Sequence, residues 1–135
     1  TEGKPGLIQR TLETGVQNIL IDLSVLDVPD VGPAAKAIYL CKEKFGYPAG
    51  CAPANAIDMW RRAKALSQSD FVSSHASLLA GTVMMGANFT MYGPISRADI
   101  SYPAVAAADA IVAYTTRQQY RTKPLTDAHP LFKIF

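Results

Sequence analysis

The sequence predicts an α/β fold in which short parallel strands alternate with helices. Three short segments have the composition of strands, and segments with a helical pattern separate them. Parallel strands need a crossover that a helix provides, so this alternation indicates βαβ units. Three parallel strands cannot close a barrel, and an open sheet of three would leave two unpaired edges. The simplest interpretation is the C-terminal βα units, about strands 6–8, of a TIM (β/α)8 barrel.

The three strands are predicted from short runs that end next to polar residues. Residues 18–23 contain an Ile-Leu-Ile run that ends at Asp22 and suits a strand buried on both faces. Residues 48–52 are small, and we interpret them as a strand mainly because the alternation requires one there. Residues 88–92 form the third predicted strand, and a Gly-Pro pair follows them.

The helices are predicted from apolar stripes and from residues that start or stop a helix. Gly15 and Gly46 are natural stops, whereas Asp30 suits an N-cap and Pro33 suits a first turn. We expect the apolar tail, residues 129–135, to pack on the domain. The predicted helices cover residues 6–14, 33–45, 55–66, 70–85 and 101–119.

Composition and charge exclude several classes of protein. The chain has 49% hydrophobic and 18% charged residues, an ordinary composition for a globular domain. Its net charge of +2, without a basic stripe, argues against a protein that binds nucleic acid. No apolar run approaches the roughly 18 residues of a membrane helix, so we expect a cytoplasmic protein without membrane insertion. Cys41 and Cys51 form no CxxC pair and are predicted to be free thiols.

Candidate site residues follow the predicted strands, because barrel enzymes carry their chemistry at the carboxyl ends of strands. No HExxH, CxxC, P-loop or GxSxG motif is present, so we predict a polar site without a metal. A carboxylate can accept from two neighbouring N–H donors of a ligand ring, and an Asn amide can donate and accept. The candidates are Asp22 with Ser24, Asn55, Asp58, and Tyr92 with Gly93.

The same residues have structural interpretations that remain open. Asn55 followed by Asp58 also fits a helix-capping arrangement, and Asp22 also fits a cap of the turn after its strand. His75 lies on an apolar helix face and suits a buried, hydrogen-bonded histidine better than a ligand. The others are interpreted as turn or solvated residues: Tyr92, Gly93, Pro94, Arg61 and Arg62.

Four segments together resemble the H-subunit family of tetrahydromethanopterin S-methyltransferase, including methyltetrahydrofolate-dependent corrinoid methyltransferases of the glycine betaine type. They are residues 18–32 (NILIDLSVLDVPDVG), 46–60 (GYPAGCAPANAIDMW), 86–94 (GANFTMYGP) and 129–135 (HPLFKIF). The resemblance covers nearly the whole chain. It implies a pterin-binding TIM barrel of which residues 1–135 are the C-terminal portion.

The resemblance also implies an activity and a site. The family transfers a methyl group between N5 of methyl-tetrahydrofolate or methyl-tetrahydromethanopterin and the cobalt of a corrinoid protein, and the partner protein carries the cobalamin. It implies that Asp22 holds the pterin and that the catalytic residue Asn55 lies near N5. The folate relatives carry Gln where this chain has Asp58. We expect a homodimer, and we expect the chain to need the N-terminal half of the barrel for activity.

Other functions fit parts of the pattern. A dihydropteroate-synthase-like enzyme would also bind a pterin, but it needs a basic phosphate motif that the sequence lacks. A non-catalytic assembly fragment of a methyltransferase complex would use the apolar tail for packing. A phosphate-binding half barrel is a weaker alternative, which rests on Gly86 and Gly93 around the last strand.

Overall fold

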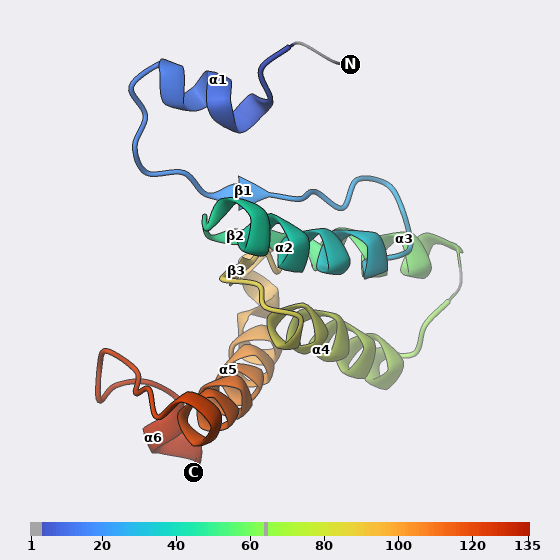
Figure 1. Cartoon of the computed structure of the whole chain (residues 1–135). Coiled ribbons are helices and arrows are strands. Elements are labelled where there is room, and N and C mark those ends of the chain that lie inside the picture. Colours follow the sequence, from blue (N-terminus) through green and yellow to red (C-terminus); the bar gives the residue numbers. More distant parts are fainter. Residues whose placement is uncertain (1–3, 64) are drawn as a thin grey trace.

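The computed structural model describes residues 4–63 and 65–135 and has the mixed α/β architecture that the sequence predicts. Helices and strands follow one another in the predicted order, although the strands are shorter than the predicted segments. The elements are α1 (Leu7–Glu13), β1 (Ile21–Asp22), α2 (Gly32–Phe45), β2 (Ala49–Cys51), α3 (Pro53–Ala63), α4 (Gln68–Met84), β3 (Phe89–Thr90), the 3-10 helix η1 (Ile95–Arg97), α5 (Ala98–Tyr120) and α6 (Leu131–Ile134) (Figure 1).

The three strands form one parallel sheet in the order β1-β2-β3. The register aligns Asp22 with Gly50, and Gly50 in turn with Phe89. Backbone bonds continue past the strand ends, since Leu23 N donates to Gly50 O at 2.8 Å and Met91 N donates to Cys51 O at 3.0 Å. The predicted parallel sheet is therefore confirmed.

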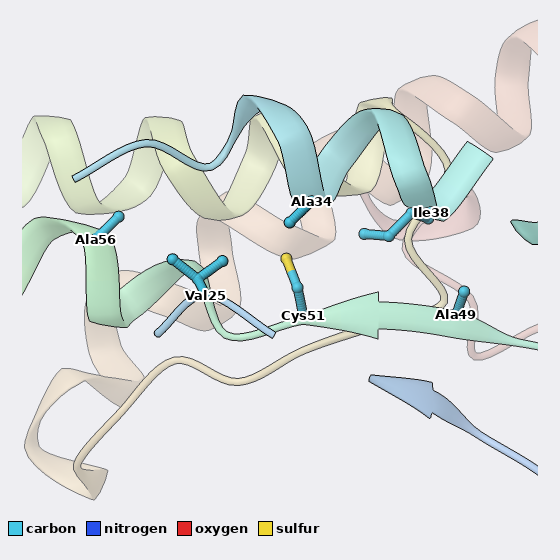
Figure 2. Packing of buried hydrophobic residues seen from close by; sticks show 6 residues of the cluster. All are labelled: Val25, Ala34, Ile38, Ala49, Cys51 and Ala56. Atoms are coloured by element: carbon cyan, nitrogen blue, oxygen red, sulfur yellow. The ribbon is translucent and has the colours of Figure 1, made fainter. Parts of the chain in front are cut away.

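One face of the sheet carries the hydrophobic core. Alternate strand residues point to opposite faces, and Ile21, Ala49 and Cys51 point toward α2. Leu78 of α4 packs against the same cluster, so both helices cover this face. The buried residues of the cluster are Val25, Ala34, Ile38, Ala49, Cys51 and Ala56 (Figure 2).

The opposite face of the sheet is only partly covered in the described part of the chain: the ring of Phe89 lies close to the buried Gly50, whereas Asp22 is exposed. Its central row is Asp22, Gly50 and Phe89, by alternation with the residues that face the core. Leu20, two residues before Asp22, and Met91, two residues after Phe89, belong to the same face and are 69% and 42% exposed. Parallel sheets are normally covered on both faces, so we expect another segment of polypeptide to cover this face.

The start of α2 is confirmed, because the helix begins at Gly32 and Pro33 lies in its first turn. Its predicted cap and the predicted start of α4 are wrong, because local side-chain contacts differ from the prediction. Asp30 is not the N-cap of α2: its Oδ1 accepts from Gly32 N at 2.8 Å, and Val31 occupies the cap position. The helix predicted from residue 70 begins at Gln68, because Ser67 Oγ accepts from Asp70 N and caps it.

The other differences lie in α3 and α5. The helix predicted for residues 55–66 is Pro53–Ala63, and residue 64 lies outside the described residues. The last long helix begins at Ala98 rather than at residue 101, because η1 leads directly into it and Pro103 is accommodated inside the helix. None of the described helices is long and apolar enough to cross a membrane.

The C-terminal tail packs on α5, as the sequence predicts. Leu131 is buried, and the rings of Tyr114 and Phe135 lie 5.5 Å apart. His129 joins the two elements, since its Nδ1 accepts from Leu131 N and its Nε2 lies 3.1 Å from Asp109 Oδ2. The tail is thus linked to α5 by a polar contact as well as by apolar packing.

We expect Gly50→Ala to destabilise the fold by about 1–3 kcal/mol, the usual cost of overpacking. A Cβ at Gly50 would collide with the carbonyl oxygen of Phe89 and lie 2.8 Å from its ring. Urea unfolding measures the change. Gly81→Ala is the matched control, because a Cβ there meets nothing within 4 Å and the helix gains about 0.5–1 kcal/mol. Equal stability of the two variants would contradict the close approach of β2 and β3.

Candidate functional site

The carboxyl ends of the three strands meet at one edge of the sheet, and the candidate residues lie there. Asp22 ends β1, and Asn55 and Asp58 lie in the first turns of α3, directly after β2. Gly93 and Arg97 follow β3. Parallel pairing thus brings three loops that are distant in sequence to a common edge.

Asp22 caps the turn that follows its strand. Its Oδ1 accepts from Ser24 N at 2.9 Å, and Ser24 takes a φ of +40°. The structural interpretation of Asp22 is therefore confirmed, but it engages only one carboxylate oxygen. Among the described residues no donor contacts Oδ2, and the side chain is exposed. The turn fixes the carboxylate and leaves acceptor capacity for a ligand.

Asn55 fastens α3 to the loop after β1. Its Nδ2 donates to Val25 O at 2.7 Å, and Trp60 Nε1 donates to Pro29 O in the same loop at 2.5 Å. The helix-capping interpretation of Asn55 is wrong, because α3 begins at Pro53 and the side chain reaches a different loop. The amide keeps its carbonyl oxygen and one N–H, so it can still accept from and donate to a ligand.

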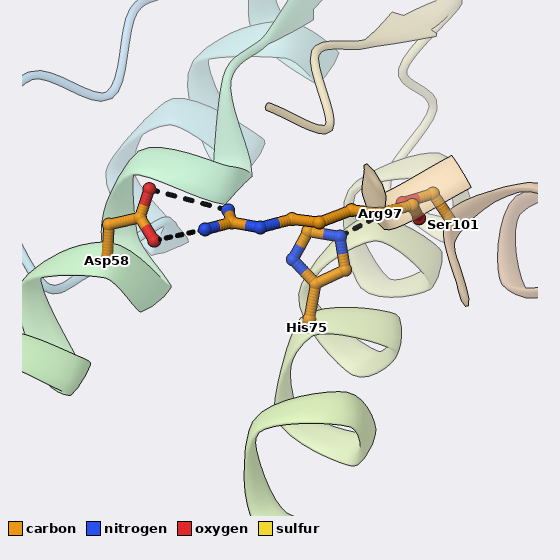
Figure 3. Close-up of polar contacts among 4 residues, drawn as sticks. All are labelled: Asp58, His75, Arg97 and Ser101. Atoms are coloured by element: carbon orange, nitrogen blue, oxygen red, sulfur yellow. Dashed lines mark hydrogen bonds and ion pairs between the residues drawn. The ribbon is translucent and has the colours of Figure 1, made fainter. Parts of the chain in front are cut away.

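Asp58 forms an ion pair with Arg97 that no sequence pattern predicts. Arg97 Nη2 lies 2.6 Å from Asp58 Oδ1, and Nη1 lies 3.4 Å from Oδ2 (Figure 3). This two-pronged geometry joins α3 to η1, and it rules out a capping role for Asp58. The only hint in the sequence is that Arg97 follows the third predicted strand and its Gly-Pro turn.

Arg97 is itself held by α4 and α5. Its guanidinium lies 5.1 Å from the centre of the Phe71 ring, and Arg61 lies 4.8 Å from the same ring. Ser101 Oγ donates to Arg97 O at 2.7 Å, and His75 Nε2 lies 3.0 Å from Ser101 Oγ (Figure 3). Ser101 donates its single hydroxyl proton to Arg97 O, so its Oγ can only accept from His75. The proton of the neutral His75 ring therefore lies on Nε2.

His75 is a buried structural histidine, as predicted. Burial lowers its pKa from the ordinary value of 6.5, and the positive charge of Arg97 lowers it further against the opposing effect of Asp58. Its ring stacks on Phe71 with centres 5.7 Å apart. Its Nδ1 is buried and has no hydrogen-bond partner among the described residues, so the prediction of full hydrogen bonding holds only for Nε2.

The remaining candidates have structural roles. Burial and the charge of Asp22 raise the pKa of Cys51 to about 11, so its thiol stays protonated at neutral pH and is a poor nucleophile. Both cysteines are free thiols, as predicted. Gly93 has a φ of +88°, which confirms the turn after β3, and the ring of Tyr92 lies 5.6 Å from that of Tyr102. Arg61 is exposed, whereas the side chain of Arg62 lies outside the described residues.

The comparison with known protein families gives a match over nearly the whole chain. Residues 1–124 match the family model described as "Tetrahydromethanopterin S-methyltransferase MtrH subunit". The chain belongs to the MtrH family. The matched range contains all the residues of the candidate site, namely Asp22, Asn55, Asp58 and Arg97. Membership confirms the family that the sequence segments resemble.

Curated relatives in the MtrH family are named as H subunits of tetrahydromethanopterin S-methyltransferase. The chain is 29% identical to that of Methanothermobacter thermautotrophicus over 133 residues, 30% to that of Methanocaldococcus jannaschii over 144, and 28% to that of Methanosarcina barkeri over 137. Each similarity covers 96% of this chain but only 42%, 44% and 43% of the respective relative. The chain therefore spans less than half the length of these MtrH relatives.

The buried histidine predicts how stability depends on pH. Between the lowered pKa of folded His75 and 6.5, the unfolded chain binds a proton that the folded chain does not. The free energy of unfolding should thus decrease as the pH falls below 6.5, by at most about 1.4 kcal/mol per pH unit. Chemical unfolding at several pH values measures this slope. His75→Asn should flatten it, whereas His129→Asn, which leaves His75 in place, should keep it; an unchanged slope in His75→Asn would refute the assignment.

Proposed function

We propose that the chain supplies the pterin-binding edge of a methyltransferase that acts on a methyl-tetrahydropterin. The observation that carries the proposal is the pair Asp22 and Asn55, which the fold fixes at neighbouring strand ends with hydrogen-bonding capacity to spare. The names of the relatives include tetrahydromethanopterin and methyltransferase, and they make methyl-tetrahydromethanopterin the first substrate to test. Methyl-tetrahydrofolate is the second.

In this proposal Asp22 binds the edge of the pterin ring. An N–H and an amino group that lie side by side present two parallel donors, and a carboxylate accepts both. The Ser24 N–H already holds Asp22 Oδ1, so the carboxylate does not need to reorient when the ligand arrives. Each oxygen has two lone pairs, which leaves capacity for two ligand donors.

Asn55 acts at N5, where the methyl group leaves. As the N5–CH3 bond breaks, its electron pair remains on N5, which takes up a proton, and the methyl group passes to the acceptor. A hydrogen bond that strengthens as this charge develops lowers the barrier. The bond from Asn55 Nδ2 to Val25 O orients the amide and leaves one N–H and the carbonyl oxygen for N5 and its proton.

The proposed acceptor is the cobalt of a corrinoid protein. A partner protein holds this corrinoid and supplies a strong metal nucleophile, while the residues of this chain bind and orient the pterin. Asp58 supports the same network from one helical turn beyond Asn55, where residues three apart lie on the same side of a helix. Its carboxylate is 35% exposed and so remains accessible to a ligand.

We further propose that the sheet is part of a (β/α)8 barrel that polypeptide outside these residues completes. The partly covered face with exposed Leu20 and Met91 supports this, because barrel strands turn one face to the outer helices and the other to the interior. An apolar groove of about 290 Å³ lies between α1 and residues 16–22, and we propose that a neighbouring βα unit of the barrel packs into it. The site then needs the remaining strands, and we expect the chain alone to be inactive and the complete enzyme to be a homodimer.

Replacing Asp22 should weaken pterin binding. Asp22→Asn removes a charge-assisted interaction worth about 1.5–3 kcal/mol, so the Kd for methyl-tetrahydromethanopterin should rise about 10- to 100-fold. Calorimetric titration of the complete enzyme, with its polypeptide content established by intact mass, measures this. Asp27→Asn is the control, because Asp27 is an exposed carboxylate in the same loop. Binding that survives Asp22→Asn would reject the pterin role of Asp22.

Replacing Asn55 should affect the methyl-transfer step more than binding. Asn55→Ala removes a group that acts in the transition state, and we expect the rate at saturating pterin to fall about 100-fold with a smaller change in Kd. Single-turnover methylation of a corrinoid protein measures the rate. The control Gln119→Ala removes an exposed amide side chain near the carboxyl end of α5, outside the candidate site. A rate that Asn55→Ala leaves unchanged would remove Asn55 from the methyl-transfer step.

Two results would favour other functions. An enzyme that binds the pterin but condenses it with an aromatic amine, rather than demethylating it, would be dihydropteroate-synthase-like. A complete assembly that binds neither pterin, and whose components separate when the tail is altered, would make the chain a structural component of its complex.

A further inference from the structure

The geometry around Asp58 assigns a role to Arg97, a residue that neither the sequence pattern nor the family comparison singles out. Two guanidinium nitrogens face two carboxylate oxygens, at 2.6 Å and 3.4 Å. A planar guanidinium in this arrangement fixes the plane of the carboxylate as well as its position, which a lysine ammonium cannot do. The partners are 39 residues apart in the sequence, and the pair connects α3, which follows β2, with η1, which follows β3.

Arg97 and Asp58 differ in how far their side chains are exposed to solvent. The Arg97 side chain is 14% exposed, whereas that of Asp58 is 35% exposed. Arg97 therefore lies behind Asp58, and the carboxylate is the member of the pair that a ligand meets first. Two of the lone pairs of Asp58 face Arg97, and those on the other side of the oxygens remain for a ligand.

Arg97 is anchored at both ends. Its guanidinium lies against the Phe71 ring. Its backbone carbonyl accepts a hydrogen bond from Ser101, which in turn contacts His75 (Figure 3). The turn at Gly93 also lies close to the guanidinium, since a Cβ at Gly93 would be 3.1 Å from Arg97 Nη1. Contacts from three directions leave the guanidinium little freedom, so it holds Asp58 in a nearly fixed orientation.

We propose that Arg97 is a positioning residue that holds the Asp58 carboxylate in the orientation needed to accept from the pterin. The inference rests on the proposed function, because it concerns the same site. Arg97 compensates the negative charge of Asp58, so the pair can accept from a neutral ligand without adding net charge to the edge. Arg97 acts through Asp58 and does not itself touch the pterin.

A double-mutant cycle in the complete enzyme tests this role, with the Kd for methyl-tetrahydromethanopterin as the readout. Arg97→Gln alone should raise the Kd about tenfold, because a coupling free energy of this size is usual between two residues in contact. Asp58→Asn should raise it to a similar extent. Adding Arg97→Gln to Asp58→Asn should then change the Kd little further, because no carboxylate is left to orient. Arg97→Lys should restore only part of the loss, since an ammonium lacks the fork.

Arg61→Gln is the matched control. It removes a guanidinium that contacts the same Phe71 ring but has no carboxylate partner among the described residues, so the Kd should stay unchanged. Melting temperatures of all variants identify losses caused by instability. If Arg97→Gln raises the Kd equally in the presence and absence of the Asp58 carboxylate, Arg97 contacts the ligand or only stabilises the fold, and the proposal is wrong.

The outcome also separates this inference from the proposed function. An enzyme that binds the pterin and loses affinity in Asp22→Asn, but not in Arg97→Gln, keeps the proposed function and overturns the role of Arg97. An enzyme that binds no pterin overturns both.

Discussion

The close approach of β2 and β3 at Gly50 is the constraint on which the rest of the structure depends. Gly50 pairs with Asp22 on one side and with Phe89 on the other, and its missing Cβ leaves room for the Phe89 carbonyl and ring. The strands are only two or three residues long, so few other backbone bonds determine their register. A shift by one residue would turn Asp22 toward the core and Ile21 away from it. The position of the site therefore follows from the packing around one glycine.

Polar contacts add to the buried Val25 in holding the loops at the carboxyl edge. The loop after β1 is exposed from Leu26 to Asp30, and α3 fastens it with the bonds from Asn55 and Trp60 to its carbonyl groups. The ion pair of Arg97 with α3 does the same for the segment after β3. Hydrogen bonds of this kind fix direction as well as distance, and a binding site needs fixed directions. The side chains proposed to bind the pterin also build the edge on which they lie.

The sequence predicted the order of elements and the parallel sheet, because both follow from local patterns and from short strands that alternate with helices. It predicted Asp22 and Asn55 as edge residues for the same reason. It could not predict the partner of Asp58, since Arg97 lies 39 residues away and no periodicity relates the two. Helix starts were missed where a single contact decides them, as at Ser67 for α4, and the second strand was predicted only from its neighbours. Local patterns thus predict elements, whereas side-chain pairing between elements depends on the assembled fold.

The partly covered face of the sheet and the proposed ligand site are one surface. Ile21 and Leu23 pack toward the core, so Asp22 between them points to the partly covered face, which it shares with Leu20 and Met91. In the proposed barrel, the strands that cover Leu20 and Met91 also enclose Asp22 and remove water from around it. A carboxylate attracts the donors of a pterin more strongly once water is excluded, because the effective dielectric constant falls. Completion of the barrel therefore adds contacts from other strands and also strengthens the contacts that this chain already provides, which gives a physical reason why the edge alone should bind weakly.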